Sequence, residues 1–190
     1  MNENETVMNT GSTPSPGRSN PFTPPDDLAE WMDARALLTF VLEAVPAVEL
    51  PDARKDFVAA DGQAFRPPML LTLLAYCYAR GWADADGIEV LIPRDPMLRY
   101  ITTGDRLTAN DLVRFRRARR ETIEQILTLV FEKAWQHTRM TAELRFGERS
   151  QYLDYSLYRW FENPLAPDFA KLARQRVDQA VLLDSVAKDV

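Results

Sequence analysis

The chain has 190 residues, of which 46% are hydrophobic and 27% charged, an ordinary globular mixture with room for one domain or two very small ones. Its formal net charge of −5 argues against a protein that coats nucleic acid wholesale. No apolar run approaches the roughly 20 residues that span a bilayer, and the polar N-terminus does not resemble a secretory signal. We therefore expect a cytoplasmic protein that does not bind membranes.

The N-terminal part of the chain changes character near residue 26. Five prolines lie among small polar residues in the first 25 positions, so we expect residues 1–25 to form a disordered tail. Asp26 or Asp27 can cap a first helix that ends near Val45, before Pro46.

The middle of the chain predicts a buried helix and two shorter elements. Pro67 and Pro68 suit the first turn of a helix, and the following residues, 69–78, are apolar nearly all round, as in a central helix. Gly81 can end it. Short elements follow at residues 88–92 and 95–101.

The clearest helical pattern begins at Thr108, which has capping-box spacing with Asp111. No glycine or proline interrupts residues 108–137, so this segment is one long helix or two abutting helices. A last helix is expected at about 168–187. The core is predicted to contain Leu70, Leu73, Leu74, Phe115, Ile126 and Val130.

These patterns predict an all-α protein, in which a compact multi-helix domain carries a helix-turn-helix-like segment behind the disordered tail. Residues 26–138 form the domain, and residues 139–190 form a helical C-terminal extension. Residues 95–101, a turn containing Gly104 and the helix after Thr108 supply the helix-turn-helix outline.

Signatures of enzymes are missing from the sequence. It has no phosphate-binding glycine loop and no dinucleotide fingerprint. The lone histidine, His137, has no histidine or cysteine partner for zinc. We therefore expect no catalytic residues, no metal and no cofactor.

A block of arginines is the one feature that suggests binding chemistry. Residues 94–120 contain eight arginines and three aspartates, and arginine suits phosphate and the guanine edge. The candidate DNA-binding residues are Arg106, Arg114, Arg116, Arg117 and Arg120. The alternative is a solvated face whose arginines pair with Glu121, Glu124 or the acidic N-terminal half.

Residues 65–120 resemble the InsH-type N-terminal domain of DDE insertion-sequence transposases. The resemblance depends on five features in order: Phe65-Arg66-Pro67-Pro68, the apolar helix from Met69 to Gly81, Ile88-Glu89, the short helix from Met97 to Gly104, and Leu112-Val113-Arg114-Phe115-Arg116-Arg117. Residues 26–138 are the matched part.

Two departures from the family limit what this resemblance implies. The step after Gly81 is acidic here, Trp82-Ala83-Asp84-Ala85-Asp86, where the family is basic. Beyond His137 nothing matches the catalytic domain, and Asp154, Glu162 and Asp168 lie within fifteen residues of one another without the strands that would gather them around two metal ions.

The resemblance therefore implies a transposase-derived protein that binds double-stranded DNA and lacks strand-transfer activity. Its protein partner would be a second copy of the chain or a full-length transposase. The alternative function is a protein-interaction or assembly module with no DNA binding, in which the arginines contact a protein or the chain's own acids.

Overall fold

The computed structural model describes residues 24–49, 55–147 and 166–186. Most of the expected tail, residues 1–23, and most of the residues between the predicted long helical segment and the last helix, 148–165, lie outside this part. The described elements are η1 (Leu28–Glu30), α1 (Ala34–Ala44), η2 (Val45–Ala47), β1 (Phe57–Val58), β2 (Ala64–Phe65), α2 (Pro67–Ala79), α3 (Ala85–Leu91), α4 (Pro96–Thr102), α5 (Ala109–Ala118), α6 (Arg120–Gly147) and α8 (Phe169–Val186). The predicted all-α class is confirmed.

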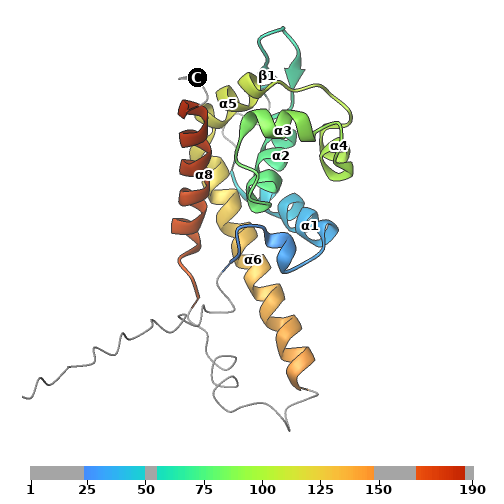
Figure 1. The fold of residues 1–190 in the computed structure, drawn as a ribbon, viewed down its shortest axis with the longest axis vertical. Coiled ribbons are helices and arrows are strands. Elements are labelled where there is room, and N and C mark those ends of the chain that lie inside the picture. The colour runs from blue at the N-terminus through green and yellow to red at the C-terminus, as the bar shows by residue number, and fades with distance from the viewer. Residues whose placement is uncertain (1–23, 50–54, 148–165, 187–190) are drawn as a thin grey trace, which may run out of the picture.

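Helix α6 separates two layers of the fold (Figure 1). On one side α8 runs antiparallel to the first half of α6, so that Phe169 lies against Trp135, with ring centroids 5.9 Å apart. On the other side α1 and α2 pack against α6. The fold thus has α8 outside, α6 in the middle, and α1 and α2 beyond it.

Helix α2 is the centre of the hydrophobic core. Its proline pair occupies the first turn as predicted, and every residue from Leu70 to Ala79 is buried. Gly81 adopts a φ of 73°, and the Trp82 N–H donates to the Cys77 carbonyl at 2.9 Å, which closes the helix as its glycine predicted. The predicted core is confirmed, since Leu70, Leu73, Leu74, Phe115, Ile126 and Val130 all belong to one buried cluster.

The predicted first helix is divided in two. Asp27 caps only the short η1, whereas Asp33 caps α1 by accepting hydrogen bonds from the Arg35 and Ala36 amides at 2.9 and 3.0 Å. Those bonds also lower the pKa of Asp33 below its ordinary value. A second aspartate with a strong capping preference therefore starts a new helix inside the predicted one.

Helices α5 and α6 are the two abutting helices that the uninterrupted pattern allowed. Arg119, with φ −127° and ψ 24°, separates them. Residue 138, the expected end of the transposase-like domain, lies within α6. A short antiparallel hairpin, in which Phe57 pairs with Phe65, was not predicted.

The helix-turn-helix outline is present in sequence order but not as a packed pair. Helix α4 packs chiefly on α2 and α1, whereas α5 packs chiefly on α3, α2 and α6. Among the described helices, none is both long enough and apolar enough to cross a bilayer.

Candidate nucleic-acid interface

Helix α5 carries the candidate arginines, and its start is fixed by local capping. The Thr108 hydroxyl accepts from the Asp111 amide at 3.2 Å, and Asp111 accepts in return from the Thr108 amide, at 3.4 Å, as the capping-box spacing predicted. The Ala109 amide donates to Glu89 of α3 at 2.6 Å. The N-terminus of α5 is therefore occupied by the chain's own acids.

The hairpin is attached to the same helix. The Ala60 amide donates to Asp111 at 3.2 Å, and the Phe57 ring meets Phe115 edge-on, with centroids 5.3 Å apart. Phe57 lies on the hairpin and Phe115 on α5, so these two contacts hold the hairpin against α5, and the Arg114 guanidinium lies 5.4 Å from the centre of the Phe57 ring. The hairpin thereby forms one border of the candidate interface.

Arg116 lies inside the protein. Its side chain is 0% exposed and forms an ion pair with Asp184 of α8, whose side chain is 3% exposed. Nη1 donates to the Tyr78 hydroxyl at 2.6 Å and to the Ala83 carbonyl at 3.3 Å. Burial raises the pKa of Tyr78 to about 12, so its hydroxyl is neutral at physiological pH. With α8 in this position, Arg116 is not accessible to DNA.

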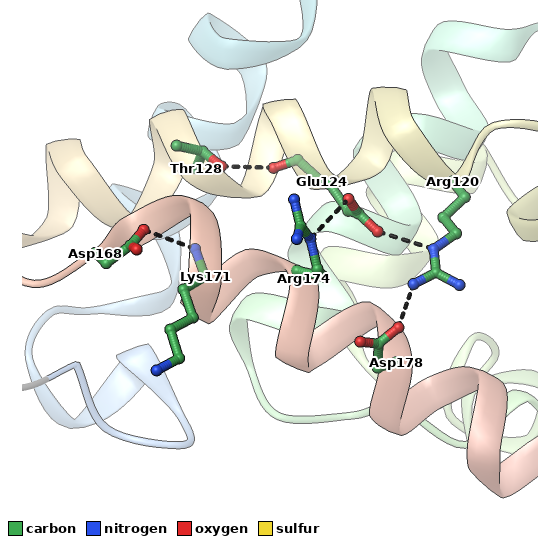
Figure 2. Close-up of polar contacts among 7 residues, drawn as sticks. All are labelled: Arg120, Glu124, Thr128, Asp168, Lys171, Arg174 and Asp178. Carbon is green, nitrogen blue, oxygen red and sulfur yellow. Dashed lines mark hydrogen bonds and ion pairs between the residues drawn. The ribbon is translucent and has the colours of Figure 1, made fainter.

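Arg120 is partly exposed and paired with two acids (Figure 2). Its Nε donates to Glu124 at 2.9 Å, one turn along α6, and its Nη2 donates to Asp178 of α8. The bond to Glu124 is the main cause that raises the pKa of Arg120. Arg174 of α8 lies 4.0 Å from the other oxygen of Glu124. The charge of Arg120 is thus largely compensated by two carboxylates of the chain itself.

The remaining three candidates are exposed. Arg114 lies 3.8 Å from Asp111 and 5.4 Å from the centre of the Phe57 ring, and 47% of its side chain is accessible. Arg106 and Arg117 are exposed and form no ion pair with any residue in the described ranges. Of the five candidates, only Arg106 and Arg117 are both exposed and without an ion pair in the described ranges, whereas Arg114 is exposed beside Asp111, Arg120 is partly exposed beside two acids, and Arg116 is buried.

Arg106 also borders a surface cleft of about 670 Å³ between α3, α4 and the start of α5. Arg99 lines the same cleft, but so do Glu89 and Asp105. Because two acids balance the two arginines, the cleft itself is not a strongly basic site. Arg114 and Arg117 of α5 do not line this cleft.

Sequence reasoning anticipated Glu124 as a partner but missed Asp178 and Asp184. A signal for Asp184 was present in the spacing of α8. Ala173, Val177 and Ala180, its buried apolar residues, recur every three or four positions, and Asp184 follows at the next step of four. An acid that continues an apolar stripe is expected to face inward.

The three acids that the sequence analysis compared with a catalytic triad are not seen to form an active site within the described residues. Asp154 and Glu162 lie outside the described residues, and Asp168 accepts a hydrogen bond from the Lys171 amide at 2.9 Å in the first turn of α8. Within the described ranges, no cluster of three histidine, cysteine or acidic side chains could hold a metal ion. Compared with protein-family models, with curated proteins and with solved structures, the chain matches none.

Proposed function

We propose that this protein is a transposase-derived module that binds double-stranded DNA and lacks strand-transfer activity. The contacts are assigned to Arg106, Arg114 and Arg117, a smaller set than the arginine block suggested. The observation that supports this proposal most is the exposure of these three guanidinium groups, two of which have no ion-pair partner among the described residues.

The three residues lie on α5 or just before it. Arg114 and Arg117 are three residues apart on α5 and share one face of the helix. Arg106 precedes the helix by three residues. Exposed arginines attract phosphate because a guanidinium group donates hydrogen bonds and carries a permanent charge. The acidic remainder of the chain opposes this attraction at a distance, so we expect modest affinity from a monomer.

The test is a titration of short duplexes at several salt concentrations. The quantity measured is the slope of the logarithm of the binding constant against the logarithm of the salt concentration. Each neutralised phosphate contributes about −0.9 to this salt slope, so three contacts give a slope of roughly −2.7. Arg117→Ala should make the slope shallower by about 0.9. Arg35→Ala is the matched control, because Arg35 is exposed on α1 and its loss removes the same charge without touching α5.

The pairing of Arg116 and Arg120 with the chain's own acids favours a second candidate, a protein-interaction or assembly module with no DNA binding. If no duplex binds even at low salt, or if Arg117→Ala and Arg35→Ala behave alike, the DNA-binding proposal is wrong. The assembly function then predicts that the exposed arginines affect the mass of the protein in solution. Sedimentation of the wild type and of an Arg106, Arg114 and Arg117 triple alanine variant measures this.

A further inference from the structure

The surroundings of Arg116 resemble an anion-binding site that is already occupied. Its Nη1 is engaged by Tyr78 and Ala83, and its Nη2 by Asp184. Its Nε is buried and has no acceptor among the described groups. Nε and Nη2 lie on the same edge of a guanidinium group, which is the edge that binds an oxyanion with two parallel hydrogen bonds. Asp184 uses half of this edge.

A phosphate group would use the edge more completely than Asp184 does. Arginine has five donors in a fixed fork, and a phosphodiester offers two unshared oxygens with the single negative charge that Asp184 now supplies. Replacement of one by the other leaves the charge balance around Arg116 unchanged. The unsatisfied Nε would gain an acceptor, which removes the cost of a buried unpaired donor.

Helix α8, which supplies Asp184, packs closely along α6, and most of its buried apolar side chains are small. Up to residue 184, its fully buried apolar residues are Ala173, Val177 and Ala180, which remove little apolar area from water compared with leucine or phenylalanine. Phe169 and Leu172 add only partly buried contacts. Near the middle of α8, Arg176 forms an ion pair with Asp26 at 3.4 Å. Ionic attachment of this kind weakens as salt or a competing anion increases.

We propose that Arg116 and Tyr78 form a phosphate-binding site in which Asp184 of α8 takes the place of a DNA backbone phosphate. This inference depends on the proposed DNA-binding function and extends it. Docked α8 limits the interface to Arg106, Arg114 and Arg117, and undocked α8 adds Arg116 as a fourth contact. The helix therefore competes with DNA for its own protein.

The first test compares Asp184→Asn with Glu30→Gln in duplex titrations at several salt concentrations. Both changes remove one negative charge, but Glu30 is an exposed residue of η1 with no ion pair among the described residues. Because duplex displaces α8 in only part of the wild-type complexes, Asp184→Asn should steepen the salt slope by up to about 0.9, the value of one additional phosphate contact, whereas Glu30→Gln should leave it unchanged. Adding Arg116→Gln to Asp184→Asn should return the slope to that of the wild type.

The outcomes separate this inference from the function on which it depends. If the wild type binds duplex and Asp184→Asn has the same slope as Glu30→Gln, the phosphate site is wrong and the DNA-binding function stands. If no protein binds at low salt, both are wrong. If the wild type binds, Asp184→Asn has the steeper slope and Arg116→Gln removes that increase, the inference is supported.

A second test needs no substitution and so does not depend on the folding of a variant. Hydrogen exchange of the wild-type chain should show α8 amides losing protection when duplex is added, because the phosphate displaces the helix. Unchanged or increased protection would overturn the proposal. Inorganic phosphate at the same ionic strength is the parallel arm, and loss of protection with phosphate alone would assign the site to a free anion instead of DNA.

Discussion

The ion pair between Arg116 and Asp184 permits a quantitative test of how α8 is attached. Both side chains are at most 3% exposed, so removal of either one leaves a charged group buried without its partner. We consider Asp184→Leu and Arg116→Met, which replace each charge by an apolar side chain, together with the double variant. The quantity to be measured is the free energy of unfolding.

Breaking a buried pair by removing one partner costs about 3–5 kcal/mol when the remaining charge stays buried. Here the loss cannot exceed the free energy with which α8 docks, because undocking lets water reach Arg116. We therefore expect each single variant to lose at least about 1 kcal/mol, and at most about 3–5 kcal/mol, of its free energy of unfolding. The double variant should recover most of the loss, since apolar replacement of a whole buried pair is often neutral or stabilising.

Urea denaturation followed by circular dichroism gives both the free energy and the m-value. A lower m-value in the single variants would show that α8 is already undocked in the native state, since less surface is then exposed on unfolding. The reasoning is refuted if each single variant costs less than about 0.5 kcal/mol, as surface substitutions do. It is also refuted if the double variant loses the sum of the two single losses, because the residues would then be uncoupled.

Three further predictions concern a core leucine, the glycine that follows α2 and the Tyr78 hydroxyl. Leu74→Ala should cost about 2–5 kcal/mol in urea denaturation, because Leu74 is completely buried in α2. Gly81→Ala should cost about 1–3 kcal/mol in the same assay, since Gly81 has a φ of 73° and an added Cβ would lie 2.8 Å from the Asp26 carbonyl oxygen. Tyr78 should ionise only near pH 12, as followed by tyrosinate absorbance. Because its pKa is raised above the unfolded value of about 10, its contribution to stability is present below pH of about 10 and is lost as pH rises through its folded pKa.

Features of the fold that depend on local sequence could be predicted. The run of apolar residues between Pro68 and Gly81 predicts α2 because proline and glycine mark its two ends and no polar face remains for solvent. The capping box at Thr108 predicts the start of α5 for a similarly local reason. The hairpin at residues 57–65 was missed because its strands have two residues each, too short for an alternating pattern.

Which arginines are buried and which are exposed could be predicted from the sequence only in part. Arg116 lies four residues after Leu112 and one after Phe115, on the helix face that those two residues bury, so its inward direction was readable from spacing. Its partner was not readable in the same way, because Asp184 is 68 residues away in sequence and is brought close only by the packing of α8 on α6. An ion pair of that kind depends on tertiary structure.

The number of available arginines determines how strongly salt controls DNA binding, and this links α8 to a measurable property. With three contacts, a rise in salt from about 50 to about 200 mM reduces affinity by about 40-fold, since a slope of roughly −2.7 acts over a fourfold change. With Arg116 released as a fourth contact, the same rise reduces affinity by about 150-fold. Salt also weakens the exposed ion pair between Arg120 and Asp178 of α8, so undocking increases with salt while each phosphate contact becomes weaker. The two effects oppose each other, and the wild type should therefore show a curved log–log plot, whereas Asp184→Asn, in which the acid no longer competes, should show a straight and steeper one.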